Sequence, residues 1–104
     1  MKRRGTISWI AAQPYYKVKR VVSSVEQKAI VEDRLMHLYQ ERIVTKYREF
    51  PISEVFDLSY RSIGGAGGLL YLHTLQGVYS YTVAADPQPF IEAYKELVQS
   101  SPGK

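Results

Sequence analysis

The fold is indicated most clearly by residues 69–99, which read LLYLHTLQGVYSYTVAADPQPFIEAYKELVQ. Residues 69–74 and 78–83 alternate and are rich in aromatic and β-branched side chains, which pack well on a pleated sheet. Between them, Leu75-Gln76-Gly77 predicts a tight hairpin loop with glycine where a positive φ is expected. A helix then extends to about Gln99. Short antiparallel strands closed by one helix predict a mainly β (α+β) binding scaffold rather than a catalytic fold.

The predicted helix has a well-marked start and one apolar face. Asp86 is a strong N-cap, and Pro87 suits the first helical position because its missing N–H would have no partner there. The apolar stripe has spacings of three and four residues and consists of Phe90, Ile91, Tyr94, Leu97 and Val98. Buried against a sheet, each large side chain contributes about 1.5–3 kcal/mol, so we expect this stripe to seal the core.

A further strand is predicted at residues 53–62, in which Phe56, Leu58 and Tyr60 point one way. The run Gly64-Gly65-Ala66-Gly67-Gly68 follows it and needs unusual backbone angles. The run lacks the Lys-Ser/Thr of a phosphate-binding P-loop, and a strand rather than a helix comes next. We interpret it as a flexible hairpin tip that a partner can contact.

Two strands are predicted near the N-terminus. Residues 6–12 alternate, and Gln13-Pro14 is expected to interrupt them. Residues 15–22 then place apolar side chains on one face and Lys17 and Lys19 on the other, which is typical of a half-exposed strand.

Residues 23–33 allow two interpretations. Ser23-x-x-Glu26 and Ser24-x-x-Gln27 both match the helix capping box, which favours a short helix over residues 25–31. The apolar stripe of that helix is weak, so residues 28–32 fit a strand as well.

Residues 34–39 and 42–50 predict a hairpin that turns at Gln40-Glu41. Pro51 cannot donate to a strand ladder, and we expect it to end the second strand. The whole chain therefore predicts six or seven antiparallel strands followed by one helix.

The size and composition of the chain indicate an ordinary globular domain. Its 104 residues, 45% hydrophobic and 23% charged, correspond to one domain, with loose ends at residues 1–5 and 100–104. Cysteine is absent, which excludes disulfides, thiol catalysis and thiolate metal sites. Residues 7–12 are too short an apolar stretch for a transmembrane or signal segment, so we expect a soluble, cytoplasmic protein.

Positive charge is concentrated in the first half of the chain. Residues 1–52 contain eleven Lys or Arg against five acids, whereas residues 53–104 contain three against five. These cations either keep a solvated sheet surface and its edges soluble or form a binding face. Basic residues neutralise phosphates and exposed tyrosines stack on bases, but strand alternation predicts that Tyr16 and Tyr47 face inward. The basic and aromatic set comprises Tyr15, Tyr16, Lys17, Lys19, Arg20, Lys46, Tyr47 and Arg48.

The sequence resembles the bacterial pleckstrin-homology (PH)-like domains in the run Leu38-Tyr39-Gln40-Glu41-Arg42-Ile43-Val44-Thr45-Lys46 and in Phe50-Pro51-Ile52-Ser53-Glu54-Val55. Gly77-Val78-Tyr79-Ser80-Tyr81 and then Asp86-Pro87-x-Pro89-Phe90-Ile91 are similar to the last strand and capping helix of that family. The resemblance covers about residues 34–99. It implies a PH-like barrel of two roughly orthogonal sheets with a helix at one open end. It also implies a binding or scaffolding module, sometimes near membranes, rather than an enzyme. The Lys-x-Arg element, Lys46-Tyr47-Arg48, occurs later than in phosphoinositide-binding members, so the lipid signature is not matched.

Residues that could carry chemistry are scattered. His37 and His73 belong to different predicted strands, and neither has a second ligand at metal-binding spacing. No nucleophile elbow accompanies the Ser, His and Asp residues. We therefore predict no catalytic, metal-binding or cofactor-binding residues, and no small-molecule substrate.

The predicted function is binding of a protein partner or formation of a homo-oligomer. Binding of an anionic lipid surface or of single-stranded nucleic acid through the basic first half is the alternative. Contacts are expected at the basic face, the glycine-rich loop and any unpaired sheet edge. The candidate binding residues are Lys17, Lys19, Arg20, Lys46, Arg48, Gly64, Gly65, Gly67 and Gly68.

Overall fold

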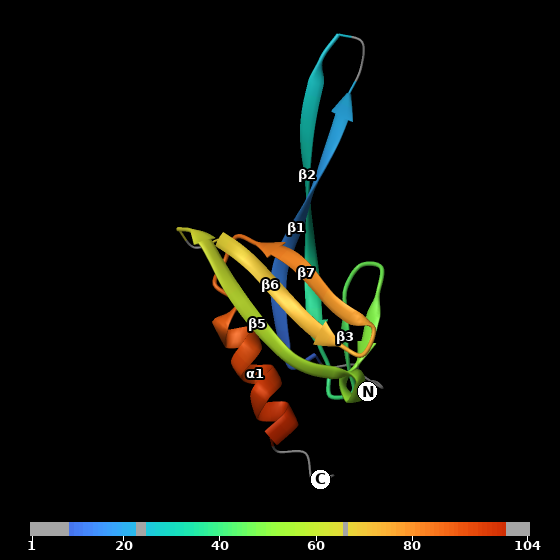
Figure 1. Cartoon of the computed structure of the whole chain (residues 1–104), viewed down its shortest axis with the longest axis vertical. Coiled ribbons are helices and arrows are strands. Elements are labelled where there is room, and N and C mark those ends of the chain that lie inside the picture. The colour runs from blue at the N-terminus through green and yellow to red at the C-terminus, as the bar shows by residue number, and fades with distance from the viewer. Residues whose placement is uncertain (1–8, 23–24, 66, 100–104) are drawn as a thin grey trace, which may run out of the picture.

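A computed structural model describes residues 9–22, 25–65 and 67–99, which form a mainly β fold with a C-terminal helix, as predicted (Figure 1). The predicted loose ends, residues 1–5 and 100–104, lie outside the described residues. A short 3-10 helix, Ile52–Glu54, links the two halves of the chain. The other elements are β1 (Ala11–Val22), β2 (Gln27–Leu38), β3 (Arg42–Val44), β4 (Glu49–Pro51), β5 (Val55–Gly64), β6 (Gly67–Thr74), β7 (Gly77–Val83) and α1 (Gln88–Gln99).

The strands of the described chain belong to one antiparallel sheet with the order β4-β3-β2-β1-β7-β6-β5. This order contains two meanders, β1–β4 and β5–β7, which meet where β1 lies beside β7. The register pair at this junction is Tyr16 with Thr82. Because the two meanders are joined over so short a length, the sheet is strongly bent at this junction (Figure 1). Helix α1 lies beside β1 and β5.

The core lies between the meanders and is closed by α1. The Tyr94 hydroxyl donates a hydrogen bond to the backbone carbonyl of Val55 at 2.9 Å, which ties α1 to β5. Burial raises the pKa of Tyr94, and the nearby Asp57 carboxylate acts in the same direction. The buried apolar residues are Tyr15, Met36, Leu38, Ile43, Phe50, Val55, Leu58, Leu70, Leu72, Val83, Phe90, Ile91 and Tyr94.

The cap at Asp86 is as predicted, but α1 begins at Gln88, one residue after the predicted start at Pro87, and its apolar stripe is shorter. The backbone N–H of Gln88 donates to the Asp86 carboxylate at 3.0 Å, which is the expected cap. Leu97 packs partly against the core, whereas Val98 is 43% exposed, so its predicted burial is wrong. Among the described residues, no helix has the length and apolar content needed to cross a bilayer.

Strand β1 runs through Pro14 without interruption, so the predicted break at Gln13-Pro14 is wrong. A proline is tolerated where its nitrogen is not needed in a ladder. Pro14 is paired with Leu35 of β2, and the register pair of β1 with β7 is at Tyr16 instead. Of the strand predicted at residues 6–12, residues 6–8 lie outside the described residues, and Trp9 and Ile10 precede β1.

Strand β2 settles the two interpretations of residues 23–33. The helix over residues 25–31 is wrong, because residues 27–38 form one strand paired residue by residue with β1. The β-branched Ile30 and Val31 favour this pairing, and the proposed helix had too few apolar residues to bury. Ser23 and Ser24 of the capping boxes lie outside the described residues.

The single strand predicted at residues 42–50 is wrong, because a turn separates β3 from β4. In this turn the N–H of Thr45 donates to the Arg48 carbonyl at 2.8 Å. The Arg48 N–H donates back to the Thr45 hydroxyl at 3.1 Å. The predicted turn at Gln40-Glu41 and the strand end at Pro51 are confirmed.

Strand β5 begins with a bulge that the sequence pattern did not reveal. Phe56 was predicted to point the same way as Leu58 and Tyr60, but it is 63% exposed whereas Leu58 is buried. A register shift between Val55 and Asp57 adds one residue to β5 and reverses the alternation before Leu58. Leu58 is buried and Tyr60 packs against the core, as predicted.

The glycine run divides into a turn and a strand. Gly65, with φ 56°, lies in the predicted hairpin tip, and Gly64, with φ 147°, is the last residue of β5. The prediction is wrong for Gly67 and Gly68, which belong to β6. Gly68 is buried, and a Cβ there would lie 2.2 Å from the carbonyl oxygen of Arg61. Glycine is therefore required at position 68 by the close approach of β5.

The β1–β2 hairpin extends well beyond the rest of the sheet (Figure 1). The described chain measures 58 Å in its longest dimension, against 36 and 27 Å in the others. Beyond Tyr16, β1 has lost its partner β7, and β2 pairs with β3 only at His37 and Leu38. Residues 17–22 and 27–32 therefore form a two-stranded ribbon whose edges carry no further strand within the described chain. We call this ribbon the arm.

Candidate functional site

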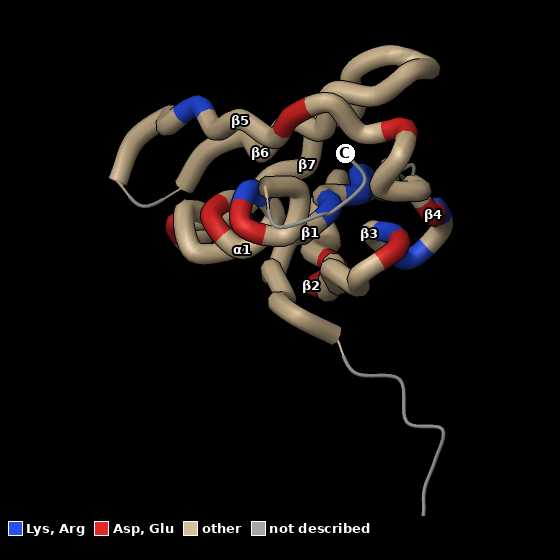
Figure 2. Tube along the Cα trace, turned by 90° about the horizontal axis from the view of Figure 1, so that it is seen from below, with Lys and Arg blue, Asp and Glu red and all other residues tan. Residues whose placement is uncertain are grey.

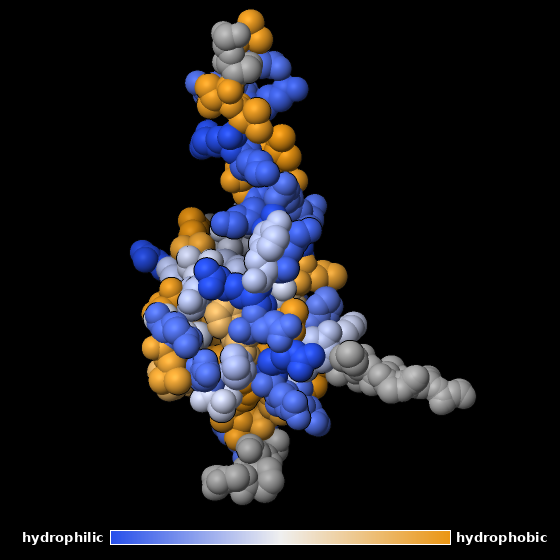
Figure 3. Space-filling model, turned by 90° about the vertical axis from the view of Figure 1, so that its right-hand side faces the viewer, coloured by the Kyte–Doolittle hydropathy of each residue, from blue (hydrophilic) through white to orange (hydrophobic). Residues whose placement is uncertain are grey.

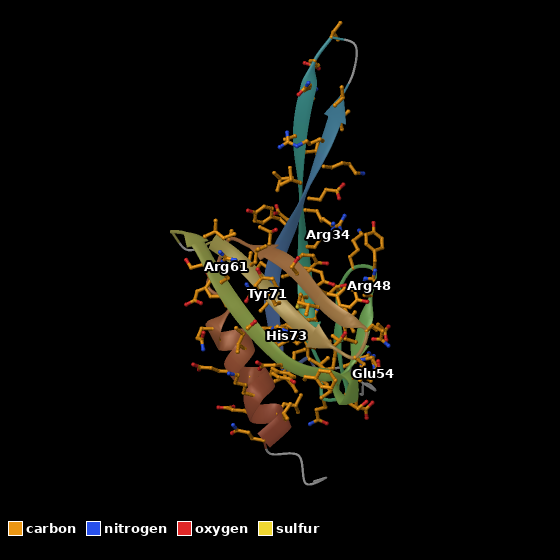
Figure 4. All side chains as sticks on the ribbon, in the orientation of Figure 1. Arg34, Arg48, Glu54, Arg61, Tyr71 and His73 are labelled. Carbon is orange, nitrogen blue, oxygen red and sulfur yellow. The ribbon has the colours of Figure 1, made fainter. Side chains whose placement is uncertain are left out.

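A concave, positively charged surface lies at the foot of the arm. It consists of two adjoining hollows of about 640 and 530 Å³ that share Lys17, Arg34 and Tyr47, and we call it the basic groove. In Figure 4, Arg34 lies at the foot of the arm and Arg48 on the β3–β4 side, whereas Arg61 lies across the body on β5. The lining residues are Tyr15, Tyr16, Lys17, Val18, Lys19, Glu32, Asp33, Arg34, Thr45, Lys46, Tyr47, Arg48, Tyr79, Ser80, Tyr81 and Thr82.

The floor of the groove is aromatic and uncharged. The rings of Tyr15 and Tyr81 meet edge to face with their centroids 5.1 Å apart. The Tyr15 hydroxyl accepts a hydrogen bond from the backbone N–H of Lys46 at 3.1 Å, so β1 holds the β3–β4 turn in place. Burial raises the pKa of Tyr81 above its ordinary value near 10, although the hydrogen bond with Thr45 opposes this, and the phenol stays neutral at physiological pH.

One rim of the groove is built around Tyr47, which is 75% exposed. The guanidinium of Arg34 lies 5.1 Å from the centre of its ring and the ammonium of Lys46 lies 5.8 Å from it. The predicted inward orientation of Tyr47 is therefore wrong, since strand alternation does not apply within the turn. In β1 the inward tyrosine is Tyr15, and Tyr16 is half-buried.

The opposite rim is formed by Arg48. Its guanidinium lies 4.7 Å from the ring centre of Tyr79, which in turn packs edge to face on Phe50 at 5.0 Å. The N–H donors of a guanidinium lie in its own plane, so stacking on a ring does not block them. A carboxylate or phosphate can still accept hydrogen bonds from them. The position of this cation is thus set by the core beneath it.

The groove has an excess of positive charge. Glu32 is shared between Lys19, at 3.8 Å, and Arg34, whose side chain is only 11% exposed. In the part of the chain that the structure describes, no carboxylate lies within ion-pair distance of Lys17, Lys46 or Arg48. Figure 2 shows that cationic positions gather around β1 and β3, and the sequence of β5–β7 contains only Arg61. The site suits an anion.

The predicted binding residues do not form one surface. Lys17, Lys46 and Arg48 are brought together in the groove, and Lys19 lies at its edge. Arg20 lies outside the groove, opposite Ala29 on the arm. The glycines predicted to bind, Gly64, Gly65, Gly67 and Gly68, line neither hollow and lie at the β5–β6 turn, across the body from the groove (Figure 1).

Arg34 is a groove residue that the sequence prediction missed. It lies opposite Tyr15 in the β1–β2 register. Met36 and Leu38, which are buried, follow Arg34 at steps of two residues along β2 and therefore lie on the same face of the strand as Arg34. An arginine on the inward face of a strand was the available signal, but it could be recognised only once residues 27–38 were known to form one strand.

The two histidines have local partners outside the groove. The Ser59 hydroxyl oxygen lies 2.7 Å from His73 Nε2 on the outer face of β5 and β6, where Figure 4 places His73 next to Tyr71. His37 packs between the rings of Trp9 and Tyr39, at 5.5 and 6.2 Å. Within the described ranges, no three His, Asp or Glu residues are placed to hold one metal ion.

Comparison with known proteins adds no relative. A scan against protein-family models finds no match, and neither do the comparisons with curated proteins and with solved structures.

Proposed function

We propose that this protein is a non-catalytic binding module of PH-like architecture whose basic groove binds an acidic segment of a partner protein. The observation that carries the proposal is that three cations, Lys17, Lys46 and Arg48, line the same groove as the exposed Tyr47 and have no carboxylate partner among the described residues. When an anion binds to such cations, the favourable electrostatic energy is not offset by the breaking of an internal ion pair.

The chemistry of the groove favours carboxylates on a peptide chain. Arg48 offers a planar fork of donors that matches a carboxylate, and Lys17 and Lys46 add charge without a fixed direction. Tyr47 supplies a large, partly apolar contact area with little conformational freedom to lose. The two hollows together extend over several side chains, which suits an extended segment better than a single small ion.

The frame around the groove is rigid, which supports a binding role. Tyr15 fixes the β3–β4 turn through the backbone of Lys46, and Tyr79 fixes Arg48 from below. A site that is ordered before its ligand arrives loses less entropy on binding. The PH-like part of the proposal is supported by two antiparallel meanders whose common core is closed by one C-terminal helix.

The proposal is tested with a fluorescein-labelled peptide of about twelve residues, rich in Glu with one Tyr, whose binding is followed by anisotropy at low salt. The double variant Lys46→Glu with Arg48→Glu should weaken binding at least about tenfold, because each site charge is reversed. The matched control is Arg61→Glu with Lys95→Glu, which changes net charge equally at exposed positions outside the groove. Binding should also weaken as salt rises. An equal loss in both double variants would contradict a groove-specific site.

Single-stranded nucleic acid is the second candidate, and the exposure of Tyr47 between two cations favours it. A base stacked on such a ring contributes about 1–3 kcal/mol. Tyr47→Ala should then weaken binding of a labelled oligothymidine at least about fivefold, whereas Tyr47→Phe should not. If the oligonucleotide binds more tightly than the acidic peptide, the partner is a nucleic acid. Co-sedimentation with anionic but not neutral vesicles would instead indicate a membrane surface.

A further inference from the structure

The arm carries an apolar face that the described chain does not cover. Strand alternation and the β1–β2 register place Val18 opposite Val31 on this face, with Val22 two pairs nearer the tip. Val18, Val22 and Val31 are 49%, 69% and 56% exposed. Toward the foot of the arm, the pair Pro14 and Leu35 continues the face, and Leu35 is 51% exposed. Figure 3 shows hydrophobic side chains reaching the surface along the arm.

The other face of the arm has a different character. Lys17 lies opposite Glu32 and Lys19 opposite Ile30, and Lys19 forms an ion pair with Glu32 at 3.8 Å. Charged side chains thus cross this face and leave fewer apolar atoms uncovered. An isolated two-stranded ribbon is marginally stable in water, so the arm gains most if its apolar face is covered.

Two charges on the apolar face identify what covers it. On this face, the next pair toward the tip from Val18–Val31 is Arg20–Ala29, and the next pair toward the foot is Tyr16–Asp33. Neither Arg20 nor Asp33 has an ion-pair partner among the described residues. Opposite charges at equal distances from a common centre are self-complementary under two-fold symmetry.

We propose that the arm is a dimerisation element, and that the apolar faces of two copies pack on each other in antiparallel orientation around the Val18–Val31 pair. A two-fold axis that crosses the strands at this pair brings each Arg20 over the Tyr16–Asp33 pair of the other copy. The same operation places Val22 over the Pro14–Leu35 pair. All five pairs on this face, from Pro14–Leu35 to Val22–Gln27, are thereby matched.

The size of this interface sets its expected strength. Each copy contributes ten residues from the five pairs on this face, whereas standard protein interfaces use about 20–30 residues a side. We therefore expect a reversible dimer with a dissociation constant on the order of 10 μM or weaker. The dimer goes beyond the proposed groove function, because Arg20, Val22 and Val31 are not groove residues, although Tyr16, Val18 and Asp33 belong to both surfaces.

The first test is the mass of the full chain by sedimentation equilibrium over a concentration series. Wild type should shift from monomer to dimer as concentration rises. Val31→Lys should remain monomeric at every concentration. Ile30→Lys is the matched control: the neighbouring residue in β2 has similar exposure, 44%, but lies on the other face, and it should dimerise like wild type. Both variants lie outside the core, and circular dichroism should show the same fold for each.

The second test is charge complementation between variants. Arg20→Glu and Asp33→Lys should each weaken the dimer at least about tenfold, because each places two like-charged contacts in the interface. An equimolar mixture of the two should form a heterodimer as tight as wild type, since both contacts become attractive. Acidic-peptide binding, measured on each variant, should stay within about twofold for Arg20→Glu and Val31→Lys. A monomeric wild type at all concentrations, or a mixture that stays monomeric, would overturn the proposal.

Discussion

The two ends of the β1–β2 hairpin have the same strand pairing but opposite surroundings. At the base, the end of the hairpin next to the body, Met36 and Leu38 are completely buried in the core. In the arm, Ile30 and Val31 of the same strand are 44% and 56% exposed, although their pairing with β1 is unbroken. Backbone pairing and register therefore continue well past the point where burial stops. The core does not stabilise the arm, so we expect contacts with a second copy of the chain to do so.

The largest expected difference between the two ends is in hydrogen exchange. In dilute solution, arm amides should exchange at least about a thousandfold faster than the amides of Met36 and Leu38, because the base opens only with the whole domain. Raising the protein concentration should slow exchange in the arm and leave the base unchanged if copies associate there. Equal protection from hydrogen exchange in the arm and at Met36 and Leu38 in dilute solution would contradict a difference in stability between the two ends.

Truncation of leucines within β2 should sharpen the same comparison. Leu38→Ala should lower the free energy of unfolding by about 2–5 kcal/mol, because it leaves a cavity in the core. Leu35→Ala, three residues away and half exposed, should change it by less than about 1 kcal/mol. Urea unfolding followed by circular dichroism measures both. Similar losses for the two variants would mean that the face carrying Leu35 is buried in the folded protein under the conditions of the measurement.

Removal of the Tyr94 hydroxyl should have a smaller effect, confined to the body. Tyr94→Phe leaves the Val55 carbonyl without its partner and should cost about 1–2 kcal/mol. Because burial raises the pKa of Tyr94 in the folded state, its contribution is complete below pH 10 and is lost as pH rises through the folded pKa. Between pH 9 and 12, the free energy of unfolding should fall less with rising pH for the variant than for wild type. The fall that remains in the variant comes from Tyr81, whose pKa is also raised by burial.

Removal of the arm should have the smallest effect on folding. Replacing residues 19–30 by Asn-Gly places a two-residue turn between Val18 and Val31, which are already register partners. The free energy of unfolding, measured in urea at a concentration where wild type is monomeric, should change by less than about 1 kcal/mol. The shortened protein should bind the acidic peptide but remain monomeric at all concentrations. Loss of cooperative unfolding would show that the body depends on the arm.

Prediction from the sequence was most reliable where the signal is local. The cap at Asp86, the turn at Gly77 and the strand end at Pro51 each depend on the chemistry of one or two residues, and all three are found in the structure. Prediction failed where a partner strand decides the outcome. Residues 25–31 matched a helix, but pairing with β1 extends the strand through residues 27–31.

The groove illustrates the same limit at the level of a site. Lys17, Lys46 and Arg48 were identified as basic residues of interest, but the turn at Thr45 and Arg48 reverses the expected orientation of Tyr47. The glycine run was predicted as part of the binding surface, yet it lies across the body, and Gly68 is needed for strand packing. Alternation rules hold only inside a continuous strand, so a turn or a bulge changes which side chains a ligand can meet.

The amino-acid sequence alone determined the fold class, the C-terminal helix with its cap, and the concentration of positive charge in the first half of the chain, because periodicity, capping chemistry and composition are properties of short segments. Only the tertiary structure decided that Arg34 joins Lys17 and Arg48 in one groove, that Phe56 faces outward, and that the β1–β2 hairpin extends from the body as an arm that no other described strand flanks. These features depend on register and on where each strand loses its neighbour, and both are set by contacts between residues far apart in the chain.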